Sequence, residues 1–128
     1  MEINYITADL AFDSPTSLDR IVAELEPAVS IHLHERGDGL HSVALGVAVE
    51  GSPEQTVAHV CGLLEGLSPP ARRIWDQCTR RVVDIAFESG TVPLSVTYTL
   101  PADLVRRVAN LGMAIAVTIY RVGSYSGD

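Results

Sequence analysis

Two histidines on one predicted strand come nearest, in this sequence, to the spacing of a metal site. His32 and His34 are two residues apart, so on a strand they would project from one face about 6.6 Å apart. Two imidazoles at that separation can bind one metal ion, and His41 or Glu35 could supply a further ligand. The alternative is a solvent-facing strand with two polar histidines. We favour this alternative because no third ligand has a diagnostic spacing.

Other residues that could take part in catalysis are poorly spaced for it. Asp84 and Glu88 would lie about 13 Å apart along one strand, too far for the carboxylate pair of a glycosidase. Cys61 and Cys78 occupy apolar positions of predicted helices, which is typical of inert core thiols. The sequence contains neither a G-x-S-x-G elbow nor a glycine-rich phosphate loop. We therefore expect a protein that is not an enzyme and that needs no cofactor.

The charged residues give the 128-residue chain a net charge of −7, with nine arginines and no lysine. This composition excludes a lysine Schiff base, and the acidic balance argues against nucleic acid as a partner. The pairs Arg72-Arg73, Arg80-Arg81 and Arg106-Arg107 could bind an anion. Neighbours on a helix point about 100° apart, however, so a helical pair offers one arginine to any one site. The chain lacks a signal peptide and a long apolar run, so we expect a cytoplasmic protein without membrane contact.

The elements that would position these side chains follow from the spacing of apolar residues. Alternation predicts strands, and apolar residues at i, i+3, i+4 and i+7 predict helices. In chain order we expect a strand at 3–12, a helix between Ser14 and Pro27, strands at 29–34 and 42–49, helices from Ser52 and from Ser68, strands at 81–88 and 94–100, a helix between Pro101 and Gly112, and a strand at 113–120. We also expect Ser14 to cap the first helix, and Ser52 with Gln55 to form a capping box on the second.

The strands at 29–34 and 42–49 are predicted to form a hairpin around a turn at 37–39. We expect Ser30 to lie opposite Gly46, His32 opposite Ala44, and His34 opposite Ser42, because this register places the branched apolar residues on one face.

The order of elements predicts an α+β fold. We expect a two-layer sandwich related to ferredoxin-like folds, with a mostly antiparallel sheet and the helices on one face. A single domain should cover residues 1–122, followed by a polar tail at 123–128.

Several of these markers also resemble a bacterial family. The sequence is similar to the domain-of-unknown-function family numbered four-two-seven-nine in Leu25-Glu26-Pro27, Gly37-Asp38, Trp75, Cys78, Leu104, Leu111-Gly112, Ile115 and Ile119-Tyr120. It departs from the family where His32 and His34 stand in place of a tryptophan before Gly37. The resemblance implies a bacterial α+β protein, and it supplies no catalytic residues. Some small bacterial proteins of this kind are encoded beside toxins, which makes a toxin-neutralising role one alternative.

The predicted outer face of the sheet carries small and weakly polar side chains in place of the usual charges. Its residues include Ser30, His32, His34, Ser42, Ala44, Gly46, Thr97 and Ala116. Small side chains allow a partner to approach closely, so we expect a non-enzymatic interaction module that forms a homodimer or binds a protein partner through this face. Two alternatives stay open: a small-ligand or metal-binding protein that uses His32 and His34, and a toxin-neutralising protein whose acidic surface meets a basic toxin.

Overall fold

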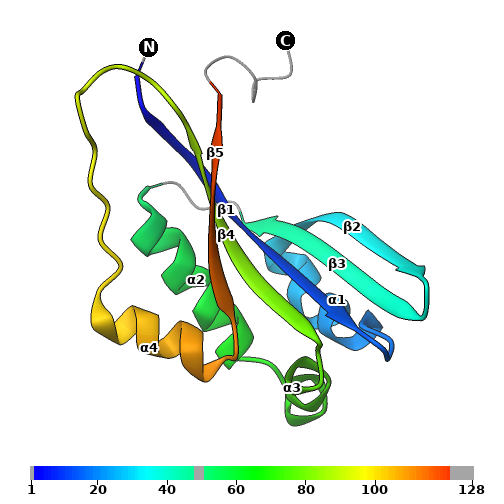
Figure 1. Cartoon of the computed structure of the whole chain (residues 1–128). Coiled ribbons are helices and arrows are strands. Elements are labelled where there is room, and N and C mark those ends of the chain that lie inside the picture. The colour runs from blue at the N-terminus through cyan, green and yellow to red at the C-terminus, as the bar shows by residue number, and fades with distance from the viewer. Residues whose placement is uncertain (1, 48–50, 122–128) are drawn as a thin grey trace.

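Five strands form a single sheet in the order β2-β3-β1-β4-β5 (Figure 1). The computed structural model describes residues 2–47 and 51–121. The strands are β1 (Asn4–Ser14), β2 (Val29–Gly37), β3 (Leu40–Val47), β4 (Arg80–Glu88) and β5 (Ala114–Tyr120). All neighbours are antiparallel except β4 and β5, which are parallel. The predicted tail at 123–128 and the end of the strand predicted at 42–49 lie outside the described residues.

Four α-helices cover one face of this sheet: α1 (Asp19–Leu25), α2 (Pro53–Glu65), α3 (Pro69–Asp76) and α4 (Ala102–Asn110). A short 3-10 helix, η1 (Glu26–Ala28), follows α1 and contains the predicted stop at Pro27. One hydrophobic core lies between sheet and helices, with Phe12, Leu45 and Trp75 fully buried in it. The predicted α+β class, with helices on one face of a mostly antiparallel sheet, is confirmed.

Serines cap two of the helices, and the capping box predicted for one of them is confirmed. Ser52 and Gln55 form the capping box of α2, in which the Ser52 hydroxyl accepts from the Gln55 N–H at 3.3 Å and the Gln55 side chain accepts from the Ser52 N–H at 2.9 Å. Ser68 caps α3 by accepting from the Ala71 N–H at 3.3 Å.

The prediction that Ser14 caps the first helix is wrong. Ser14 is the last residue of β1, where it pairs with His41, and its hydroxyl accepts from the Thr16 N–H at 3.1 Å. The helix begins only at Asp19. Ser14 belongs to the strand and not to the helix because its backbone still pairs with His41 of β3.

The strand predicted at 94–100 is also wrong. This segment is extended and joins β4 to α4 along the side of the molecule, where it is yellow in Figure 1, but it belongs to no sheet. Both edges of β4 are already occupied, by β1 on one side and by β5 on the other. The crossover through α4 brings β5 back parallel to β4, and so it takes the position that a hairpin partner would have needed.

The hairpin of β2 and β3 is confirmed, but its register is correct only in part. Ser30 lies opposite Gly46 as predicted, and the register then shifts by one residue between Ile31 and Leu33. His34 therefore lies opposite Val43, not Ser42. The turn is a tight Asp38-Gly39 pair with φ of 52° and 77°, typical of a type I′ hairpin turn.

Candidate functional site

The register shift in β2 separates the two histidines of the predicted metal site. His32 is the extra residue of a β-bulge, and an extra residue reverses the faces of the side chains that follow it. His34 consequently lies on the helix side of the sheet, where its Nε2 is 3.1 Å from Asp19 Oδ1. His32 lies on the other face over Gly46, so the two imidazoles cannot bind one ion. Within residues 2–47 and 51–121, no group of three or more His, Cys, Asp and Glu residues is placed to bind a metal.

The structure places most, but not all, residues of the predicted interaction face on one side of the sheet. Register places six of its eight residues on the outer, helix-free face, namely Ser30, His32, Ser42, Ala44, Gly46 and Ala116. His34 turns to the helix side, and Thr97 is in the 94–100 segment outside the sheet.

The outer face is not the uncharged surface that the sequence suggested. Asp9 of β1 lies beside Gly46 on one flank and Asp84 of β4 on the other, so two carboxylates oppose each other at the centre of the sheet. Thr118 donates a hydrogen bond to Asp84 at 2.8 Å from β5. Sequence reasoning missed Asp9, although its signal was present: Ala8 and Leu10 point into the core, so the residue between them must point outward.

A hollow of about 300 Å³ borders this carboxylate pair. Its lining includes Asp9, His32 and Gly46, and both the Asp9 carboxylate and the imidazole lie about 3 Å from where a Gly46 Cβ would stand. Burial raises the pKa of Asp9, and the charge of Asp84 raises it further against an opposing effect of His32. The charged form of Asp9 is therefore less favourable here than in water, and covering it with an apolar partner would require further desolvation.

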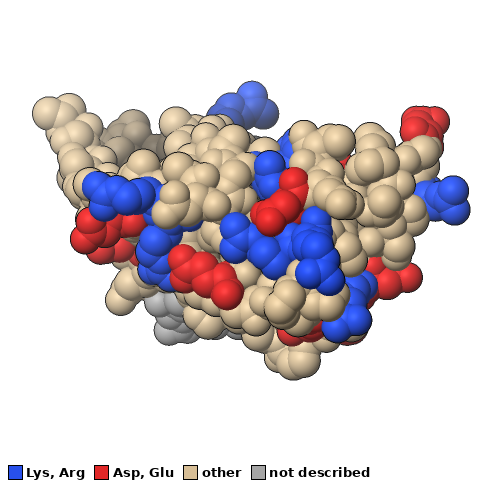
Figure 2. Space-filling model, turned by 90° about the horizontal axis from the view of Figure 1, so that it is seen from below, with Lys and Arg blue, Asp and Glu red and all other residues tan. Residues whose placement is uncertain are grey.

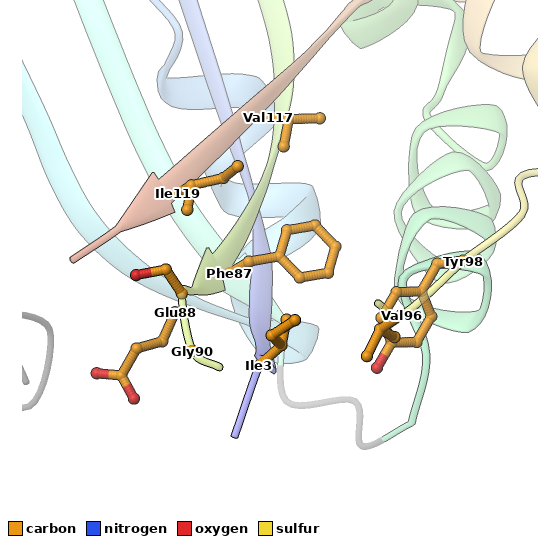
Figure 3. A pocket seen from close by; sticks show the side chains of 9 residues that line it. Ile3, Phe87, Glu88, Gly90, Val96, Tyr98, Val117 and Ile119 are labelled. Atoms are coloured by element: carbon orange, nitrogen blue, oxygen red, sulfur yellow. The ribbon is translucent and has the colours of Figure 1, made fainter. Parts of the chain in front are cut away.

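A second and more apolar cleft lies on the helix side, at the far ends of β4 and β5. Its volume is about 350 Å³, and it is lined by Ile3, Phe87, Glu88, Ser89, Gly90, Val96, Tyr98, Val117 and Ile119. In Figure 3, Val117 and Ile119 of β5 lie on one side of Phe87, and Val96 and Tyr98 of the extended segment lie on the other. We refer to this site as the β5 cleft.

Two rings that line the β5 cleft, Phe87 and Tyr98, form an aromatic cluster with Tyr5. Phe87 lies 5.8 Å from Tyr5 and 5.6 Å from Tyr98 between ring centroids, within the range of favourable aromatic pairs. The Tyr5 hydroxyl donates to the Thr56 hydroxyl of α2 at 2.7 Å, which fixes the ring against the helix layer. Largely apolar walls of this kind are typical of binding sites.

The cleft is open because the helices cover only the first part of β5. Figure 1 shows α4 beside the start of this strand, while its end extends beyond the helix layer. Val117 and Ile119 point to the helix side, in register with Ile85 and Phe87, yet they are 59% and 67% exposed. These two side chains occupy core-facing positions without a core above them.

The two edges of the sheet differ in how they resist pairing with another chain. The β2 edge contains a bulge and the charged residues Glu35 and Arg36, both of which protect an edge strand. β5 reads AIAVTIY, without a charge or a proline, and its ladder with β4 is regular. Among the described strands it pairs only with β4. An apolar, regular edge is a template for strand addition.

Charged side chains on the underside of the molecule are paired with one another. Arg107 donates to both carboxylate oxygens of Glu65 at 2.7 and 2.9 Å. Arg72 likewise pairs with Asp76 at 2.9 Å, within α3. Figure 2 shows arginines and acids interspersed over this side. The arginine pairs at 72–73 and 106–107 therefore form part of a mixed surface and do not gather into an anion site.

Comparison with known proteins returns no match to this chain among family models, curated proteins or solved structures. The resemblance to family four-two-seven-nine and the ferredoxin-like relation therefore stay predictions. None of the helices within residues 2–47 and 51–121 is long and apolar enough to cross a membrane.

Proposed function

We propose that this protein is a non-enzymatic binding module that receives an extended, apolar chain segment at the β5 cleft. The observation that carries the proposal is the row of exposed core-type side chains, Val117 and Ile119, on an edge strand without charge. An incoming strand would satisfy two needs of this region at once. Its backbone would pair with the edge of β5, and its apolar side chains would cover the row.

The β5 cleft supports binding better than the outer face does. A partner on the outer face would have to desolvate the Asp9 and Asp84 carboxylates, which costs free energy unless both find new partners. A partner on the β5 cleft would displace water mainly from aliphatic and aromatic carbon, and this is favourable. We therefore place the proposed binding site at the β5 edge of the sheet and not on its outer face.

A toxin-neutralising role has less support from the arrangement of charge. It rests on an acidic surface that steers a basic partner, and steering needs a field of one sign. Figure 2 shows arginines and acids interspersed on one side of the molecule, and Glu65 pairs with Arg107.

The proposal can be tested with a fluorescent peptide of alternating valine and threonine, flanked by arginines for solubility. We expect saturable binding by fluorescence anisotropy. Val117→Asn should weaken it roughly tenfold or more, because burying a valine contributes about 1.5 kcal/mol or more. Val105→Asn is the matched control, since Val105 is 43% exposed on α4 and does not line the cleft. Equal affinity of the wild type and Val117→Asn for the peptide would refute the proposal, as would absence of saturable binding by the monomeric protein.

A further inference from the structure

The chain contains a strand-like segment outside the sheet, and within residues 2–47 and 51–121 no strand pairs with the outer edge of β5. Residues 94–100 read LSVTYTL, a strict alternation of apolar and hydroxyl side chains typical of strands. No backbone hydrogen bond joins residues 93–100 to the strands that the structure describes. β5, one element further along the chain, has its outer edge unpaired by any described strand.

Contacts hold the 94–100 segment near both of its ends, and among its apolar side chains Leu94 is the most exposed. At its start the Ile3 N–H donates to the Val92 carbonyl at 2.9 Å. At its end Leu100 packs against the core, and Tyr98 contacts Phe87. Leu94 is 99% exposed, so this leucine contacts almost nothing in the isolated chain. A strand sequence that leaves a leucine in water has unused apolar surface to bury.

The segment and the edge match in length, charge and alternation. Both have seven residues, and neither contains a charged residue in a chain of net charge −7. If the apolar residues of both lie on the helix side, Thr97 comes opposite one of the outer-face residues of β5, and a centred register selects Ala116 in either strand direction. Thr97 and Ala116 are at the centres of the hydroxyl-bearing and small-residue sets. No side chain in either element would place a charge in the contact.

We propose that the occupant of the β5 edge is the 94–100 segment of a second copy of this chain, and that the exchange is reciprocal. This inference rests on the proposed function, because it names the chain segment that the β5 cleft receives. Reciprocity follows from symmetry: each copy carries one strand-like segment outside the sheet and one edge of β5 that no described strand pairs with, and a twofold axis satisfies both in a closed dimer. In this dimer each β5 is paired on both sides, by β4 of its own copy and by the 94–100 segment of the other.

Cysteine cross-linking between two differently marked copies tests this arrangement. One variant carries Thr97→Cys and the other Ala116→Cys, and the two are mixed and oxidised. We expect the mixed disulfide to form at least tenfold faster than a disulfide in either variant alone, because residue 97 of one copy meets residue 116 of the other. Thr97→Cys mixed with Ala44→Cys is the control, since Ala44 is on the outer face of β3. The native Cys61 and Cys78 are buried and do not compete.

Light scattering of the wild-type protein at micromolar to millimolar concentration completes the test. A dimer together with the selective 97–116 disulfide supports the inference. A dimer in which the 97–116 pair cross-links no faster than the 97–44 control overturns it, because the copies then associate elsewhere. A monomer that still binds the valine–threonine peptide overturns the inference and leaves the proposed function standing. A monomer that does not bind this peptide overturns both.

Discussion

Leu94→Ser is expected to separate self-association from folding. Leu94 is 99% exposed, so its replacement removes almost no contact within one copy. The unfolding free energy of the monomer should therefore change by no more than about 0.5 kcal/mol, as at other surface positions. In the reciprocal dimer the same side chain would cover the apolar row of the partner's β5.

The expected loss follows from the area that the dimer would bury. Complete burial of a leucine contributes about 1.5–3 kcal/mol, and a cross-strand contact on one open face buries roughly half of it, or about 1 kcal/mol. Each symmetric dimer contains this contact twice, so the loss should be about 2 kcal/mol, or roughly 30-fold in the dimer dissociation constant.

Sedimentation equilibrium measures this dissociation constant, and urea unfolding at low concentration measures the stability of the monomer. Val105→Ser is the control, because it replaces an exposed apolar residue on α4. Equal dissociation constants for Leu94→Ser and the wild type would refute the reasoning. So would a large loss of monomer stability, since it would show that Leu94 packs within its own chain.

Further expectations concern the core and the outer face. Trp75→Phe should lower the unfolding free energy by roughly 2–4 kcal/mol in urea titration, because it removes a buried indole N–H that donates to the Leu111 carbonyl at 2.8 Å and leaves a gap; a loss well below 1 kcal/mol would contradict this. Burial and the neighbouring Asp84 carboxylate raise the pKa of Asp9 above its ordinary 3.8, against the opposing effect of His32. The contribution of Asp9 to the unfolding free energy therefore falls as the pH rises through this pKa. Asp9→Asn should therefore raise the unfolding free energy in urea titration near neutral pH by up to about 1 kcal/mol, with the gain vanishing in acid; an equal gain at all pH values would refute the assignment. Burial raises the pKa of both thiols, that of Cys78 to about 11, so Ellman's reagent should label Cys61 and Cys78 at the rate of unfolding, and rapid labelling of the native protein would contradict their burial.

Local signals in the sequence determined most of the secondary structure. The capping box of Ser52 and Gln55 needs only residues within one turn, and the start of α3 at Ser68 is equally local. The alternation of Val83, Ile85 and Phe87 likewise identified the core side of β4. Each of these features depends on neighbours a few residues away, so the sequence displays it directly.

Tertiary structure alone decided which segments join the sheet and which side chains meet on it. The 94–100 segment has strand periodicity, but β1 and β5 occupy both edges of β4, and such competition leaves no mark on local alternation. A one-residue bulge at His32 sent His34 to the opposite face, which periodicity cannot foresee because it assumes an unbroken ladder. The pairing of Asp9 with Asp84 joins residues 75 positions apart and depends on the register of β1 with β4. The same competition for β4 left one segment outside the sheet and an edge of β5 that no described strand pairs with, and the proposed function rests on this edge.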